Sequence, residues 1–281
     1  MNNVIWLFTN PNKGFLMNKT IFGSLLMLVS LALSSAALAD DLYEQKAPVP
    51  FTFMQKIAPG QTVAEYPILT LGNQWSLFHS KVLRTNLGGA MANISAMDVR
   101  DGKFFATLEM TANLQEINSS DWIDEPCKPT HFLYKNGEGF RNINCATVNY
   151  NTSYFASPKG DFQTYLARFR EMNIELPPTV IRIEFTRYSD RGRRLVYSIK
   201  LNPEAFGIAR DSETVWGANS WNKAFIERDP KKVALVAALS KWADAVRDKM
   251  DKAFDHQKDA FDSLPPFDSF VKATEAIPSA R

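Results

Sequence analysis

The 281-residue sequence has few of the residues that usually reveal a catalytic or metal site. It contains three histidines, His79, His131 and His256, and no two of them have the close spacing of a helix or hairpin metal site. Neither the H-E-x-x-H pattern of zinc hydrolases nor the G-x-S-x-G pattern of serine hydrolases occurs. We therefore expect no metal site and no cofactor, and the sequence favours a protein that is not an enzyme.

An excess of positive charge is also absent. The sequence has 32 basic and 30 acidic residues. Lys13 and Lys19 are the charged residues of the first 39, and without them 30 basic residues face 30 acidic ones. A nucleic-acid-binding protein normally needs a basic surface that neutralises phosphates. We therefore expect no nucleic-acid partner, although a local basic patch is compatible with this balance.

The sequence lacks an apolar run long enough to span a bilayer, which takes about 20 residues. Its strongest run, 21–33, follows a short polar segment and precedes the Ala37-Leu38-Ala39 box, which is the order of a secretory signal peptide. We expect cleavage after Ala39 and a periplasmic or secreted product without a membrane span; an uncleaved anchor is the alternative. No lipobox cysteine follows the run, and translation starting at Met17 is an alternative to Met1.

Cysteine is scarce too, since Cys127 and Cys145 are the only two. In an exported chain such a pair predicts a structural disulfide, and the spacing is not the C-x-x-C of a redox-active pair. Asn136 and Gly137 lie between them and predict a type I′ hairpin turn that would place the cysteines almost opposite each other. The chain-entropy model gives such a bridge about 3 kcal/mol of stabilisation.

Period-two alternation of apolar and polar residues dominates from about 51 to 201 and predicts an antiparallel sheet. Asp101-Gly102 predicts a tight turn between two of the strands. In the last two strands the alternation predicts one buried and one solvated face. The expected strands are 75–83, 91–99, 103–114, 180–188 and 193–201.

Two helices complete the expected fold. One covers 161–172, before Pro177-Pro178, and the other covers 229–257, with Asp229 as its N-cap and Pro230 in its first turn. We expect an α+β fold with a mainly antiparallel sheet, strongly curved or sandwich-like, and a long amphipathic C-terminal helix packed on it. Docking of this helix on a partner is the alternative. We expect a single domain over 40–262, β-rich to about 205, and a frayed tail over 263–281.

Arginines cluster around the turn between the last two strands. Arg191, Arg193 and Arg194, with Arg187 nearby, predict a site for phosphate, sulfate or anionic lipid headgroups, because guanidinium groups match these anions. A solvated hairpin tip is the alternative.

Trp216, Asn219 and Trp221 predict a groove for a sugar or a peptide, since indole rings stack and an amide donates and accepts hydrogen bonds. Burial of the two tryptophans in the core is the alternative. The acidic residues Asp121, Asp124 and Glu125 are explained best as a solvated loop.

Together these features favour an exported, non-catalytic binding module for an envelope component or small ligand. The expected partner is an anionic envelope component, a glycan or a peptide, and the oligomeric state is left open. A hydrolase that uses His79 or His131 with a carboxylate is one alternative, and it requires a deep polar pocket that holds both groups. A structural subunit of an envelope complex is the other, and it requires a large exposed apolar patch.

Overall fold

The computed structural model describes residues 51–70, 72, 74–84, 89–114, 125–137, 142–158, 160–190, 192–265 and 269. Internal contacts divide the chain into units 1–45 and 46–281, and all the described residues belong to the second. Several predictions concern residues outside the described part. These are the leader, the start at Met17, Arg191, and the acidic residues Asp121 and Asp124. In the described part, no helix is both long and apolar enough to cross a bilayer.

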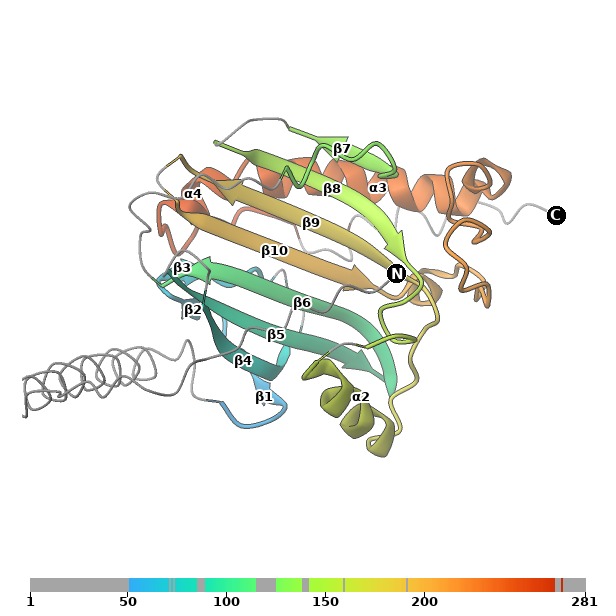
Figure 1. Cartoon of the computed structure of the whole chain (residues 1–281), viewed down its shortest axis with the longest axis horizontal. Helices are drawn as coiled ribbons and strands as arrows, with labels where there is room; N and C mark the ends of the chain where they lie inside the picture. Colours follow the sequence, from blue (N-terminus) through green and yellow to red (C-terminus); the bar gives the residue numbers. More distant parts are fainter. Residues whose placement is uncertain are drawn as a thin grey trace, which may run out of the picture. The chain divides into compact units, whose positions relative to one another are not determined.

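One large antiparallel sheet forms the body of the described structure (Figure 1). Its eight strands have the order β1-β4-β5-β6-β10-β9-β8-β7. The α+β class with an antiparallel sheet is thereby confirmed. The strands are β1 (Gln55–Lys56), β4 (Ser76–Arg84), β5 (Ala90–Arg100), β6 (Lys103–Asn113), β7 (Tyr134–Asn136), β8 (Asn144–Asn151), β9 (Val180–Tyr188) and β10 (Arg194–Leu201), and β2 (Thr62–Val63) pairs with β3 (Tyr66–Pro67) in a separate two-stranded sheet.

The β5–β6 and β9–β10 hairpins form as predicted. Asp101 and Gly102 connect β5 to β6 with φ angles of 50° and 74°, the left-handed conformation that a type I′ turn needs at both central positions. Strands β9 and β10 pair in antiparallel register from Arg194 with Tyr188 to Leu201 with Ile181. Local turn chemistry and alternation were sufficient for these two pairs.

The helices are α2 (Phe162–Glu171), α3 (Pro230–Arg247) and α4 (Met250–Phe254), with 3-10 turns at Pro203–Phe206 and Ile226–Arg228. The Asp229 carboxylate accepts hydrogen bonds from the backbone N–H groups of Lys231 and Lys232 at 3.0 and 3.4 Å, so it caps α3 as predicted. The helical region predicted over 229–257 is divided into two pieces between Arg247 and Met250.

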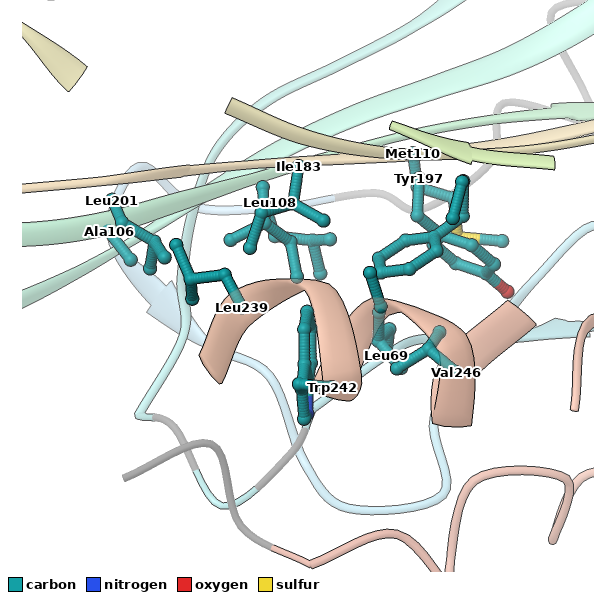
Figure 2. Close-up of a cluster of buried hydrophobic side chains, with 14 of the residues drawn as sticks. Leu69, Ala106, Leu108, Met110, Ile183, Tyr197, Leu201, Leu239, Trp242 and Val246 are labelled. Carbon is teal, nitrogen blue, oxygen red and sulfur yellow. The ribbon is translucent and has the colours of Figure 1, made fainter. Parts of the chain in front are cut away.

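Helix α3 covers one face of the sheet. Its side chains Leu239, Trp242 and Val246 belong to the same buried cluster as apolar residues of β6, β9 and β10, and Leu239 points toward Ala106 and Leu201 (Figure 2). The Trp242 ring meets the Phe185 ring edge-on, with 5.5 Å between centroids. The helix therefore packs on its own sheet through its apolar stripe, as is usual for amphipathic helices.

The opposite face of the sheet is not solvated throughout, contrary to the prediction for β9 and β10. Lys200 and Ser198 are only 4% and 5% exposed. The chain that follows β8, together with α2, packs on this face, where Phe155, Leu166 and Phe169 join Phe78 and Phe104 in a second apolar cluster. The alternation pattern is present, but a covering segment buries part of its polar side.

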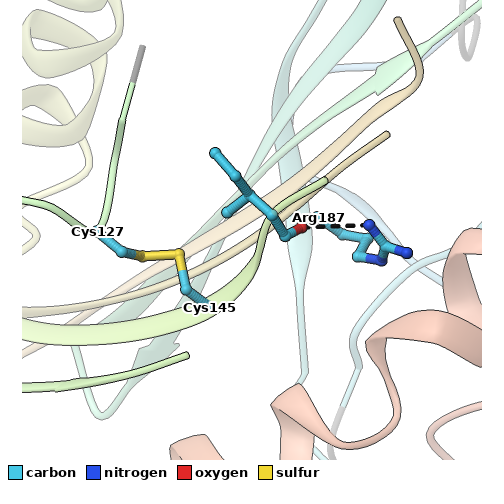
Figure 3. Close-up of a disulfide and its surroundings, with 4 residues drawn as sticks. Cys127, Cys145 and Arg187 are labelled. Carbon is cyan, nitrogen blue, oxygen red and sulfur yellow. Dashed lines mark hydrogen bonds between the residues drawn. A yellow bond between two sulfur atoms is a disulfide. The ribbon is translucent and has the colours of Figure 1, made fainter. Parts of the chain in front are cut away.

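The predicted disulfide between Cys127 and Cys145 is confirmed, with 6.4 Å between the Cα atoms (Figure 3). Beside it, Arg187 donates a hydrogen bond to the backbone oxygen of Ile143 at 3.3 Å. The predicted turn at Asn136 and Gly137 is wrong. Asn136 ends β7 and pairs with Ala146, so the connection between the two strands begins at Gly137.

Tertiary contacts explain this register. The Asn136 Nδ2 atom and the Tyr134 hydroxyl both donate to Asp244 Oδ1 on α3, each at 2.6 Å. Gly137 has φ 89°, and a Cβ atom there would lie 2.1 Å from the Asn144 oxygen. The glycine thus permits close backbone approach, and α3 holds the asparagine in the strand.

Candidate ligand-binding pocket

A polar pocket lies on the face of the sheet opposite α3. Its walls are β4, β5, β6 and the chain from the end of β8 into α2, and its volume is about 620 Å³. Asn93, Ser95 and Glu109 point into it, while their strand neighbours Ile94 and Leu108 are buried in the α3 core. The lining residues are Phe78, His79, Lys81, Asn93, Ser95, Glu109, Asn151, Ser153, Tyr154, Ser157, Pro158, Gly160, Asp161, Phe162 and Tyr165.

A carboxylate with two partners forms the floor. The Lys200 Nζ atom lies 2.6 Å from Glu109 Oε2, and the Tyr154 hydroxyl donates to Glu109 Oε1 at 3.0 Å. Burial by itself would raise the pKa of Glu109, but the charge of Lys200 and the hydrogen bonds from Lys200 and Tyr154 outweigh it and lower the pKa. Glu109 therefore presents an ionised carboxylate to the pocket.

Glu109 belongs to a balanced network of charges that extends to β9 and β10. Burial lowers the pKa of Lys200, while Glu109 opposes this shift. Arg182 donates to the Ser198 hydroxyl at 3.3 Å and pairs with Glu184. Burial also lowers the pKa of Arg182. The two cations and two carboxylates leave the network with no net charge.

One wall carries the only histidine of the pocket lining. His79 Nδ1 lies 3.0 Å from the Tyr165 hydroxyl, and the two rings meet edge-on. Burial lowers the pKa of His79, and the charge of Lys81 lowers it further, against the opposing effects of Asp161 and Glu109. At neutral pH, His79 of the folded protein is thus mainly in its neutral imidazole form.

An ion pair lies at the more exposed part of the pocket. Lys81 on β4 contacts Asp161 at the start of α2, with 2.9 Å between Nζ and Oδ2. The hydrogen bond and the charge of Lys81 lower the pKa of Asp161. Because both side chains are exposed, at 41% and 60%, the pair adds little stability, but it neutralises both charges beside the cavity.

Aromatic rings form much of the apolar lining. Phe78 on β4 lies 5.5 Å from Tyr165 and 6.3 Å from Phe162, between ring centroids. Tyr154 lies 4.8 Å from Phe162. Hydroxyl and amide groups also line the pocket, and they belong to Asn93, Ser95, Asn151, Ser153 and Ser157.

Three of the arginines considered for the predicted anion site, Arg187, Arg193 and Arg194, make contacts within the fold. Arg193 donates to the Phe254 backbone oxygen and lies over the Phe254 ring, 4.1 Å from its centroid. Arg187 pairs with Asp251 at 2.6 Å, and Arg194 lies over the Tyr188 ring. Arg193 and Arg187 therefore attach α4 to the sheet, and neither they nor Arg194 lines the pocket described above.

The three residues predicted to form a sugar or peptide groove differ in their exposure. Trp216 is 44% exposed and stacks on Tyr150, with 5.4 Å between ring centroids. Asn219 and Trp221 are completely buried, and the Asn219 amide donates to the Glu213 backbone oxygen at 2.5 Å. Their burial corrects the prediction for these two residues, since of the three only Trp216 presents surface to a ligand.

The other two histidines lie elsewhere. His131 packs edge-on against Trp216, and the ring centroids of His256 and Tyr66 are 4.2 Å apart. Among the residues that the structure describes, no group of three or more His, Cys, Asp and Glu side chains is arranged to hold a metal ion.

Sequence reasoning missed the pocket residues apart from His79, which it considered only for a hydrolase. The available signal was a charge within an apolar strand, at Glu109 in β6 and at Lys200 in β10. Such a charge is rarely buried without a partner. This signal could have marked Glu109 and Lys200 as unusual positions, but it could not have predicted that the two residues pair.

No protein-family model, curated protein or solved structure gives a significant match to this chain.

Proposed function

We propose that this protein is an exported, non-catalytic binding protein that holds a small polar ligand in the pocket between α2 and strands β4–β6. The observation that carries the proposal is the pocket itself, which joins apolar rings and converging polar groups in about 620 Å³. Pockets for small ligands typically have about 300–1,000 Å³ and this mixture of walls. The signal-like segment before Asp40 and the Cys127–Cys145 bridge support export.

Among Glu109, Asp161 and His79, the ionisation of the lining provides no ready general acid for hydrolysis at neutral pH. General acid–base catalysis usually pairs two groups whose environments push their pKa values apart. Here the pKa values of Glu109, Asp161 and His79 are all lowered, so at neutral pH none of the three is a ready proton donor. The hydrogen bond of His79 Nδ1 goes to Tyr165.

A hydrolase remains the second candidate, because the pocket places a histidine and two carboxylates along one cavity. In that case Glu109 or Asp161 would act with His79. Turnover of ester, amide or glycoside substrates that disappears in His79→Gln would establish this candidate over the binding function.

The proposed function is tested with a pocket-filling variant. Ser157 lines the pocket and is exposed, so Ser157→Trp should fill the cavity without disturbing the core. Ser212→Trp adds the same ring at another exposed serine and serves as the matched control. A thermal-shift screen of polar metabolites should give hits with the full chain and with Ser212→Trp that Ser157→Trp loses. Hits of equal size with Ser157→Trp would contradict the proposal.

A further inference from the structure

We infer that the ligand of this pocket is an uncharged saccharide, with its hydroxyl groups bound by Glu109 and its ring face held against the aromatic lining. The inference rests on the proposed function, because it names the ligand class of the same pocket. Three properties of the site carry it: its charge balance, its aromatic rings and its hydrogen-bonding groups.

The charge balance disfavours charged ligands. Lys81 has Asp161 at 2.9 Å, and Lys200 has Glu109 at 2.6 Å. A phosphate or carboxylate ligand is normally bound by cations that it neutralises itself, often in bidentate contacts with arginine. Among the residues that the structure describes, no arginine lines this pocket. A cationic ligand would compete with Lys200 for Glu109, so an uncharged ligand fits best.

The aromatic rings suit a ligand with an apolar face. Phe78, Phe162, Tyr165 and Tyr154 all line the cavity, and they come from β4 and from the segment that covers the sheet. The face of an aromatic ring carries partial negative charge and attracts weakly positive C–H groups. A sugar ring presents such C–H groups on one face and hydroxyl groups around its edge. A purely apolar ligand would instead leave the polar atoms of the lining without partners, which is costly.

The hydrogen-bonding groups match a hydroxyl-rich edge. A carboxylate accepts about four hydrogen bonds, and Tyr154 and Lys200 each contact a different oxygen of Glu109. The Glu109 side chain retains 32% exposure, so it can also accept bonds from a ligand. Ser95 lies directly opposite Glu109 in the β5–β6 pairing, and Asn93 lies two residues away on the same face. Hydroxyl donors to an ionised carboxylate make charge-assisted hydrogen bonds, which are stronger than neutral ones.

Isothermal titration calorimetry of the full chain tests the inference. The neutral probes are maltose, cellobiose, lactose and diacetylchitobiose. The charged comparators are glucuronate and glucose 6-phosphate, and the dipeptide Ala-Ala represents peptides. Two variants change the pocket: Phe162→Ala removes a ring, and Glu109→Gln keeps the size of the side chain but removes its charge. Trp216→Ala removes an exposed ring outside the pocket and is the matched control. Circular dichroism confirms that each variant is folded.

Saturable binding of a neutral disaccharide is expected, with Kd about tenfold or more higher in Phe162→Ala and Glu109→Gln and unchanged in Trp216→Ala. Phe162→Ala decides the result if Glu109→Gln does not fold. Saccharide binding that only Trp216→Ala removes would overturn the inference, since the site would then lie outside the pocket. If only the charged probes or Ala-Ala bind, and Phe162→Ala abolishes that binding, the saccharide class is overturned and the proposed function stays intact. Absence of binding by every probe, together with no hit in the thermal-shift screen, would overturn both.

Discussion

Lys200 and Glu109 form an ion pair across two neighbouring strands, with 2.6 Å between Nζ and Oε2, and the Tyr154 ring lies 4.6 Å from the same Nζ atom. Glu109 is paired in register with Ser198, and Lys200 lies two residues further along β10, so the contact is diagonal. The lysine is almost completely buried, whereas the carboxylate also reaches the pocket. The pair therefore links the stability of the sheet to the chemistry of the pocket floor.

Replacing Lys200 should destabilise the protein through the carboxylate that it leaves behind. Lys200→Met removes the cation from a site with 6% exposure of its side chain, and an unpaired buried charge is costly. We expect a loss of about 2–4 kcal/mol in the free energy of unfolding, measured by urea denaturation. Lys81→Met, which breaks the exposed pair with Asp161, is the control and should change stability little. Equal losses in both variants would show that burial of the pair is unimportant.

His79 should make stability depend on pH. Its pKa in the folded protein lies below the ordinary value of about 6.5, mainly because it is buried. As the pH falls below that ordinary value, the unfolded chain takes up a proton that folded His79 does not, so the free energy of unfolding decreases. The loss should be complete once the pH is below the folded pKa. Urea denaturation at pH 7.5 and 5.5 should show a smaller decrease in His79→Gln than in the unmodified chain, and an equal decrease would contradict this account.

Gly137 should tolerate no side chain. A Cβ atom would lie 2.1 Å from the Asn144 oxygen and 2.8 Å from Cys145 Cα, and the φ angle is 89°. Gly137→Ala should therefore cost more than about 2 kcal/mol of stability, since both strain and a backbone clash contribute. Gly102→Ala is the matched control, because Gly102 has φ 74° but nothing within 4 Å of the added atom. Thermal denaturation should rank Gly137→Ala as the less stable variant, and the reverse order would rule out the clash.

The disulfide should contribute measurable stability. Cys127 and Cys145 are separated by 18 positions in the sequence, and closing a loop of this size gives about 3 kcal/mol in the chain-entropy model. The double variant Cys127→Ala with Cys145→Ala should lose about this amount in urea denaturation. Dithiothreitol should lower the midpoint of the original chain and leave that of the double variant unchanged. A reductant effect on the double variant would mean that something other than the bridge responds.

Arg193 should matter for stability and not for binding of anions. Its guanidinium contacts both the backbone oxygen and the ring of Phe254, so Arg193→Met should loosen α4 and lower stability by about 1–2 kcal/mol. Binding to vesicles of anionic phospholipid should be the same for the variant and the original chain in a sedimentation assay. Loss of vesicle binding without loss of stability would instead restore the anion site that the arginine-rich sequence predicts.

Local signals in the sequence determined much of the secondary structure. The Asp101-Gly102 turn, the alternation in β9 and β10, and the Asp229 cap of α3 all act within a few residues, so neighbouring residues suffice to predict them. The disulfide was predictable for a different reason, since the chain has only two cysteines.

The tertiary structure decided the register of β7 and the pocket. The Asn136-Gly137 signal was overridden because Asp244, far away in the sequence, binds Asn136 within the strand. Glu109 meets Lys200 only because β10 lies beside β6, and His79 meets Tyr165 only because α2 returns over the sheet. The sequence by itself thus determined five of the strands, β4, β5, β6, β9 and β10, and the helices α2 and α3. Strand order and the covering segment decided which polar side chains share a cavity. The physical reason is that turns, caps and alternation depend on neighbouring residues, while a pocket depends on contacts between residues that are distant in the chain.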